Sequence, residues 1–366
     1  MAVYKLFPEK DATLYSEYPA MNTGIDEILE ATTAKTLDGI PVCSRFLVKF
    51  TQADILNIIN SKSTGSLAIY LKTYVAKVEG LSQDTLIYCY PVSGSWSNGT
   101  GKYLDSPAIE NGVSWEFRTT SGSNIWDTVF AGGDATGSWS GSNIGGGNWY
   151  VDPTYAQSAS FQYRSDFDLN YDVTNTVLAW YSGSIINDGF IIKQEDLAEF
   201  NLNRLTQLKY FSVDTNTIYP PELQFKWNDY SFNTGSVSQS ILENPQMVVS
   251  ISNNIGTYEP EAVQRFRLNC RPQYPPRVFN TSSFYTTNYY LPTSSFWSLI
   301  DLDTNEVVID FDSSYTRISA DNTGSYFDLY MNGLEPERYY KLLIKSDFSN
   351  GESVEMDNNL IFKVVR

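Results

Sequence analysis

SLAIYLKTYVAKV (66–78) and DTLIYCYPV (84–92) decide the fold class of this chain. Both runs are rich in β-branched and aromatic residues, and the turn-forming EGLSQ (79–83) joins them. Runs of this kind, bounded by Gly and polar residues, are typical of β-strands. Similar runs at 44–50, 158–174, 188–194, 205–213 and 220–227 predict further strands. The sequence therefore predicts an all-β protein.

Two short helices are expected among these strands. TQADILNIIN (51–60) places Thr51 where it can cap a helix, and its isoleucines and leucine supply an apolar stripe. NTVLAWYSG (175–183) predicts a single helical turn with Trp180 packed inward.

The chain is long for a single core, since it has 366 residues. A polar stretch at 228–245 makes a plausible boundary, and β-type runs continue after it. WSLIDLDTNEVVIDF (297–311) predicts a hairpin across DTNE. We therefore expect two domains, residues 1–232 and a smaller β-sandwich of the immunoglobulin-like kind at 233–366.

Composition excludes several classes of function. The net charge of −17 opposes binding to nucleic acids and to anionic membranes. The absence of histidine removes the commonest general base and the commonest zinc ligand. GSNIGGGNW (141–149) lacks the Lys-Ser/Thr of a phosphate loop. No pair of carboxylates lies in a catalytic motif, so we expect no enzyme, no catalytic residue and no cofactor.

The three cysteines, Cys43, Cys89 and Cys270, are odd in number and form no CxxC pair. They are expected to be buried, free thiols of a protein folded in a reducing cytoplasm. MAVYKLFPEKDATLYSEY (1–18) lacks the pattern of a signal peptide, and no apolar run is long enough to span a bilayer.

Loops rich in Gly, Ser and Asn carry most candidate contact residues. Trp96, Trp139 and Trp149 are candidates for a subunit interface or for stacking on a glycan, with loop anchoring as the alternative. In NGVSWEFRTTSGSNIWDTVFAGGD (111–134), the expected loop anchors are Trp115, Arg118, Trp126, Gly132 and Gly133. Arg118 is expected to pair with a carboxylate, and the two glycines to adopt conformations closed to other residues.

Calcium is the one metal for which the sequence offers candidate ligands. DLDTNE (301–306) and DFDSS (310–314) lack the turn glycine and the distal glutamate of a calcium loop. Asp11 with Asn22 is an alternative structural calcium site. We expect no metal.

Six segments in fixed order carry a resemblance to a known family. They are DATLYSEYPAMNTGIDEILEA (11–31), SRFLVKF (44–50), WSNGTGKY (96–103), the 111–134 stretch, FDLNYDVTNTVLAWYSGSIINDGFIIK (167–193) and PPELQFKW (220–227). This succession resembles the DNRLRE-type domain, a β-jelly-roll related to carbohydrate-binding modules and found in bacterial surface proteins and phage virions. The resemblance covers about residues 1–230 and implies an N-terminal jelly roll. Residues from about 240 to 366 are similar to β-rich segments of structural proteins of tailed phages, especially marine ones.

The resemblance implies a structural component of a tailed bacteriophage particle: a head decoration, neck, tail or fibre-associated protein in the virion, made in the host cytoplasm. It would contact other virion proteins and copies of itself as a homo-oligomer. The 26 Tyr, 20 Phe and 8 Trp exceed what two β-sandwich cores need, which favours an assembly surface. The alternative is a carbohydrate-binding module for host surface glycans, and a glycan-degrading enzyme is a third, weaker possibility.

Overall fold

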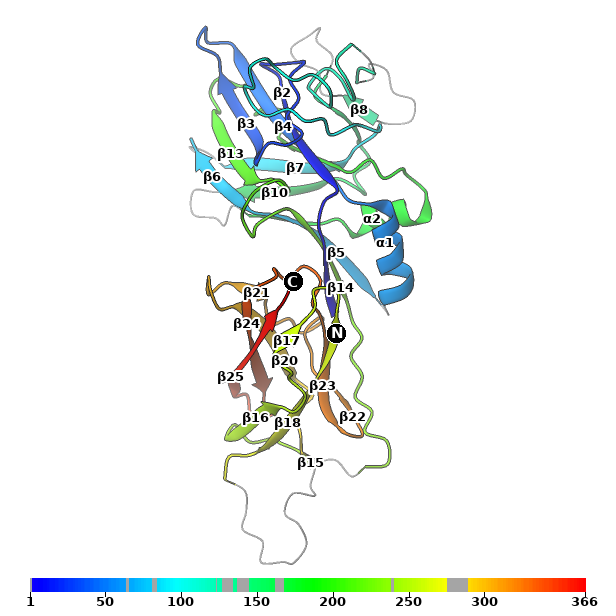
Figure 1. The fold of residues 1–366 in the computed structure, drawn as a ribbon, viewed down its shortest axis with the longest axis vertical. Helices are drawn as coiled ribbons and strands as arrows, with labels where there is room; N and C mark the ends of the chain where they lie inside the picture. The colour runs from blue at the N-terminus through cyan, green and yellow to red at the C-terminus, as the bar shows by residue number, and fades with distance from the viewer. Residues whose placement is uncertain are drawn as a thin grey trace, which may run out of the picture. The chain divides into compact units, whose positions relative to one another are not determined.

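The computed structural model describes residues 2–63, 66–80, 84–122, 124–126, 134–136 (backbone only), 145–161, 168–237, 240–274 and 289–366. The fold is all-β, as the sequence predicts (Figure 1). The chain forms two compact units. The C-terminal unit comprises Met1–Lys5, Ser63–Ala68 and Phe225–Arg366, and the N-terminal unit comprises Leu6–Lys62 and Ile69–Gln224.

The division lies between Gln224 and Phe225, earlier than the expected boundary at 232/233. The described residues of the polar stretch at 228–245 belong to the C-terminal unit. Phe232 forms a parallel bridge with Ala320, and the Asn233 N–H donates to the Ala320 carbonyl at 3.0 Å. These backbone contacts explain why the boundary comes before the polar stretch.

The N-terminal unit contains most of the strands that the sequence predicts. Its strands are β2 (Lys10–Tyr15), β3 (Ile28–Lys35), β4 (Pro41–Lys49), β6 (Val75–Glu79), β7 (Thr85–Pro91), β8 (Asp134–Thr136), β9 (Asn148–Tyr150), β10 (Gln157–Phe161), β11 (Leu169–Asp172), β12 (Phe190–Gln194) and β13 (Thr206–Phe211). Strands β1 (Ala2–Leu6), β5 (Leu67–Thr73) and β14 (Glu222–Trp227) each include residues of both units.

Strand β4 organises the eight-stranded sheet of the N-terminal unit because it pairs with three strands. Its first residues, Pro41–Cys43, pair with β3, and Ser44–Lys49 pair with β2. On its other side β4 pairs with β12, which continues to β7 and β10. Strand β3 continues to β13 and β6. All of these pairings are antiparallel, and the resulting curled sheet agrees with the jelly-roll-like architecture expected from the resemblance.

Both expected helices are present. Helix α1 (Gln52–Asn57) starts after Thr51, whose side chain makes no capping hydrogen bond, and a π-helical turn continues it over Ile58–Lys62. Helix α2 (Thr174–Ser182) buries Trp180 and ends at Gly183, whose φ of 75° suits a glycine cap.

The C-terminal unit is a two-sheet sandwich. One sheet contains β15 (Ser240–Ile241), β16 (Met247–Ile251), β18 (Val263–Pro272), β19 (Tyr289–Tyr290), β22 (Ser319–Asp321) and β23 (Gly324–Tyr330). The other contains β17 (Thr257–Tyr258), β20 (Ser295–Asp301), β21 (Val307–Ile309), β24 (Tyr339–Asp347) and β25 (Ser353–Val364). The expected hairpin across DTNE joins β20 to β21.

Aromatic side chains fill the core of this sandwich. Phe266 and Phe327 are paired in register on β18 and β23, and both are fully buried. Trp297 on β20 stacks on Phe327 with ring centroids 5.0 Å apart. Alternate residues of β18 and β23 therefore point inward to this core, and the residues between them point outward.

The three cysteines are buried and free, as expected. Burial raises the pKa of the Cys270 thiol to about 12 and also raises the pKa of Cys43 and of Cys89. Such thiols stay protonated and unreactive at neutral pH.

Candidate functional site

Every tryptophan in the described part of the chain is buried. The seven are at most 5% exposed: Trp96, Trp115, Trp126, Trp149, Trp180, Trp227 and Trp297. Trp139, Gly132 and Gly133 lie outside the described residues. Because stacking on a sugar needs an exposed ring face, the described tryptophans offer no platform for a glycan.

Trp96 is a core residue and not a contact residue. Its indole N–H donates to the Asp188 carbonyl at 2.8 Å, and Lys10 Nζ lies 4.4 Å from its ring centroid. Lys10 also donates to the Trp96 carbonyl. Because Trp96 is only 4% exposed, the expectation of ligand or subunit contact is corrected, and Trp96 is a loop anchor.

Trp149 on β9 requires the same correction. Its ring stacks on Tyr90 at 5.9 Å, and the charged groups of Arg45 and Lys193 lie 5.3 and 5.5 Å from it. The positive φ angles of the glycines at 145–147 bring the backbone so close to the sheet that a Cβ at position 147 would lie 2.6 Å from a side-chain carbon.

The expected loop anchors Trp115 and Trp126 lie in the same core as Trp96 and Trp149. The Trp126 indole N–H donates to the Ser114 carbonyl at 3.0 Å. Arg118 Nε donates to the Ile125 carbonyl at 3.4 Å, and within the described ranges Arg118 forms no ion pair with a carboxylate, so its expected carboxylate partner stays a prediction.

A buried ion network lies beside these tryptophans, and the sequence analysis missed it. Arg45 Nε and Nη2 donate to the two Glu199 carboxylate oxygens at 2.8 and 2.6 Å. Lys193 Nζ lies 3.1 Å from the same carboxylate, and the three side chains are at most 4% exposed. Arg45 Nη1 also donates to the Gly146 carbonyl at 2.7 Å. The network therefore fixes the loop at Gly146 onto β4 and is structural.

Burial and pairing act in opposite directions on Arg45. Burial lowers the pKa of its guanidinium, and the charge and hydrogen bonds of Glu199 raise it. The net direction is upward, so Arg45 stays charged inside the protein. A buried cation of this kind destabilises the fold if its carboxylate partner is removed, because its charge is then left unpaired.

The Asp11 carboxylate on β2 is engaged by hydrogen bonds within the fold. It accepts hydrogen bonds from the Val213 N–H at 2.7 Å and the Ser212 hydroxyl at 3.1 Å. Burial, with smaller contributions from the nearby Asp214 and Asp26, raises the pKa of Asp11 to about 7 against the effect of these hydrogen bonds. Asp11 is therefore a buried acid that ties β2 to the segment after β13.

Asn22 is also occupied by the fold. Its side-chain N–H groups donate to the carbonyls of Asn98 and Val113 at 2.6 and 2.8 Å. In the 301–306 turn, Arg338 donates to both carboxylate oxygens of Asp301. Among the described residues, no group of three or more Cys, Asp and Glu side chains is placed to hold a metal ion.

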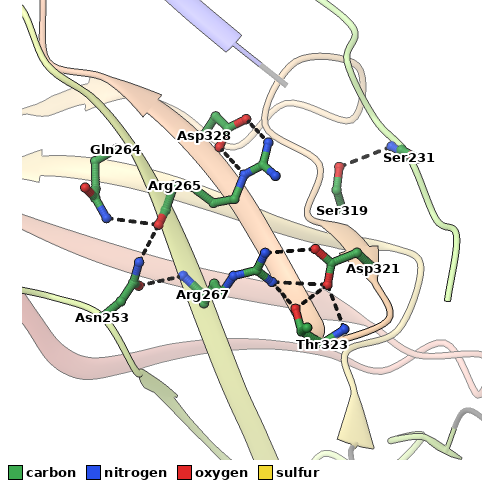
Figure 2. Close-up of polar contacts among 9 residues, drawn as sticks. All are labelled: Ser231, Asn253, Gln264, Arg265, Arg267, Ser319, Asp321, Thr323 and Asp328. Carbon is green, nitrogen blue, oxygen red and sulfur yellow. Dashed lines mark hydrogen bonds and ion pairs between the residues drawn. The ribbon is translucent and has the colours of Figure 1, made fainter. Parts of the chain in front are cut away.

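The outward face of β18 and β23 is the surface with the most specific chemistry (Figure 2). We call it the arginine–tyrosine face. It consists of Arg265, Arg267, Tyr326 and Asp328 on β18 and β23 and of Asp321 on β22. Arg265 is opposite Asp328 and Arg267 is opposite Tyr326 in the strand register, so these side chains share one side of the sheet.

Each arginine of this face is held by one carboxylate. Arg265 Nε and Nη2 donate to Asp328 at 2.8 Å each, and Arg267 Nη1 and Nη2 donate to Asp321 at 3.1 and 2.9 Å. The two guanidiniums lie 4.3 and 5.7 Å from the Tyr326 ring centroid. The face is accessible, since the Arg265 side chain is 48% exposed.

The pKa directions on this face follow from pairing. Hydrogen bonding to Asp328 raises the pKa of Arg265. Partial burial raises the pKa of Asp321, and the hydrogen bonds from Arg267 and Thr323 outweigh it, so the net direction is downward. Both charges therefore persist across the physiological pH range.

The edge of β18 next to this face is already occupied. The Asn253 side chain donates to the Arg265 carbonyl at 2.6 Å and accepts from the Arg267 N–H at 2.9 Å (Figure 2). The Ser252 N–H donates to the Arg267 carbonyl at 2.9 Å. Because these bonds satisfy the strand edge, a partner would meet the side chains of the face rather than add a strand.

No protein-family model matches this chain, and no curated protein matches it in sequence. In the described part of the chain, no helix is long and apolar enough to cross a membrane.

Proposed function

We propose that this chain is a structural component of a tailed bacteriophage particle that acts through protein–protein contacts in the virion. The proposal includes no catalytic step. Its support is the order of the N-terminal motifs, the all-β architecture of two compact units, and the kind of side chains left on the surface.

The distribution of aromatic residues carries the proposal. Among the described residues, tryptophan is used for cores, and the exposed large aromatics are tyrosines such as Tyr103, Tyr181, Tyr274 and Tyr339. Tyrosine and arginine are among the residues enriched at protein interfaces and their hot spots. The arginine–tyrosine face therefore favours contact with protein.

The alternative is a carbohydrate-binding module for host surface glycans. The resemblance to jelly rolls related to such modules supports it, and Trp139 remains a candidate because it lies outside the described residues. The burial of the other two candidates, Trp96 and Trp149, weakens it.

Two measurements on the purified protein and its particle test the proposal. Antibodies against the protein should label particles purified from the host that carries this sequence, and peptides of the protein should occur in those particles at a fixed copy number. A glycan array should give no specific binding. Absence from the particles would contradict the proposal, and strong binding to one glycan class would favour the alternative.

A further inference from the structure

The two units differ in charge. The N-terminal unit has 25 Asp and Glu against 13 Lys and Arg, a formal charge of −12. The C-terminal unit has 17 against 12, a charge of −5, and it contains seven of the 11 arginines. Arginine is therefore concentrated in the less acidic unit, and three of the seven lie on β18.

The arginine–tyrosine face is prepared to bind carboxylates. Its two guanidiniums are held in place by Asp328 and Asp321, so little side-chain entropy is lost when a partner arrives. The bonds from Arg265 to Asp328 use Nε and Nη2, which leaves Nη1 outside this pair. With Arg271 exposed on the same strand, the local charge is positive in a strongly acidic protein.

The N-terminal unit presents a surface of complementary chemistry, which we call the Tyr103 patch. It consists of Glu17, Asp26, Glu27, Asp214 and the rings of Tyr18 and Tyr103. The two rings lie 6.2 Å apart in an edge-to-face arrangement, and Tyr103 is 41% exposed. Burial, together with Tyr18 and the surrounding acids, raises the pKa of Tyr103 to about 12.

One lysine lies within this patch and does not neutralise it. Lys102 Nζ is 3.2 Å from Glu27, and both side chains are about half exposed, at 44% and 51%. Four carboxylates against one ammonium leave the patch acidic. Exposed carboxylates beside tyrosine rings are the surroundings that a guanidinium prefers, because it can bind an acid and stack on a ring together.

We propose that the arginine–tyrosine face of one copy docks on the Tyr103 patch of a second copy of this chain. This inference rests on the proposed assembly function, and it identifies a second copy of this chain as the partner in that assembly. Because the two surfaces are different, the contact is heterologous. Repetition of such a contact builds a closed ring or an extended filament.

Analytical ultracentrifugation of the full chain over a concentration series tests this contact. The wild-type protein should self-associate at low salt and dissociate at high salt, because exposed charges are screened. Arg265→Gln with Arg267→Gln should weaken association by about tenfold or more, as expected for a hot-spot pair. The matched control is Lys341→Gln with Lys345→Gln on β24, where two cations are likewise paired with Asp357 and Asp347. The control should associate as the wild type does.

A charge exchange gives the stricter test. Arg265→Glu with Arg267→Glu should not self-associate, and neither should Glu17→Lys with Glu27→Lys. An equimolar mixture of these two variants should associate, because each variant then meets the opposite charge on the other. Circular dichroism and the melting temperature should show that both are folded. If the glutamate variant does not fold, Glu17→Gln with Glu27→Gln tests the same contact from the other surface.

The outcomes separate this inference from the proposed function. A wild-type protein that stays monomeric at every concentration in low salt would overturn the contact. Association that survives the glutamine substitutions, or a mixture of folded variants that stays monomeric, would overturn it as well. In each case, presence of the protein in purified particles would leave the proposed function standing, and absence from particles would contradict that function regardless of association in solution.

Discussion

The same combination of a guanidinium, a carboxylate and an aromatic ring occurs in both units. In the N-terminal unit, Arg45 is held by a carboxylate at 2.6 Å and lies 4.9 Å from a tryptophan ring. In the C-terminal unit, Arg265 is held by a carboxylate at 2.8 Å and lies 4.3 Å from a tyrosine ring. The two arrangements have similar geometry but different exposure: the Arg45 side chain is 2% exposed and the Arg265 side chain is 48% exposed.

Burial determines what each arrangement contributes. A buried carboxylate that loses its charge leaves its cations unpaired in a poorly solvated place, whereas an exposed cation is solvated by water. The Arg45 network should therefore hold the fold together, and the arginine–tyrosine face should be available for a partner. The following substitutions test this comparison.

Glu199→Gln should have the largest effect on stability. Glutamine keeps the shape of the side chain, and it leaves Arg45 and Lys193 without their shared buried charge. We expect a loss of about 3–5 kcal/mol in the unfolding free energy of the N-terminal unit, measured by chemical denaturation. The control is Glu195→Gln, since Glu195 pairs with the part-exposed Arg204 and should cost less than about 1 kcal/mol. Equal losses of stability for the two substitutions would contradict the expected difference between the buried network and the part-exposed pair.

Asp11 should make the N-terminal unit more stable in mild acid. Its pKa is raised to about 7 by burial, above the value of about 3.9 in the unfolded chain, so the folded protein binds the proton more tightly. This stability is fully present below the unfolded pKa and is lost as the pH rises through the folded pKa. We expect the wild type to lose about 2–3 kcal/mol more between pH 5 and pH 8 than Asp11→Asn does. Parallel pH profiles for the two proteins would contradict the assignment.

Asp328→Asn should have a small effect on stability. The pair with Arg265 is exposed, and such pairs contribute about 0–1 kcal/mol. Thermal unfolding should therefore place the variant within about 1 kcal/mol of the wild type. A loss of several kcal/mol would show that the face is part of the folding core.

Asp321 should give the smallest effect, one that titration detects and unfolding does not. Its pKa is held below the usual value by hydrogen bonds from Arg267 and Thr323 against the effect of partial burial. Arg267→Gln should shift the carboxyl titration of Asp321, followed by NMR, upward toward about 3.9. An unchanged midpoint would mean that Arg267 does not hold this acid.

The sequence predicts the strands and helices of this protein well because they depend on local patterns. The β-type runs at 66–78 and 84–92 form strands, and Trp180 is inside α2 as its helical turn predicts. The compact units divide at 224/225 and not at the expected 232/233, which rests on a composition that makes 228–245 resemble a linker. Its packing depends on Ala320, which is remote in sequence.

The candidate residues were predicted less well, since their roles depend on contacts distant in sequence. Trp96 and Trp149 lie in loops rich in small residues, which suggests exposure until their positions against Asp188 and Tyr90 are known. Arg45 and Glu199 are 154 positions apart, so no spacing rule could pair them. One local signal was available for the arginine–tyrosine face: in QRFRLNCR (264–271) arginines alternate with apolar residues, as on a strand with one charged face.

Fluorescence of Trp139→Phe tests most directly whether the seven described tryptophans are buried in cores. In this variant all indole emission comes from the seven described tryptophans. Because these indoles are buried, we expect emission at short wavelengths and almost no quenching by iodide. Emission at long wavelength, with quenching close to that of free tryptophan, would show exposed indoles and contradict the account.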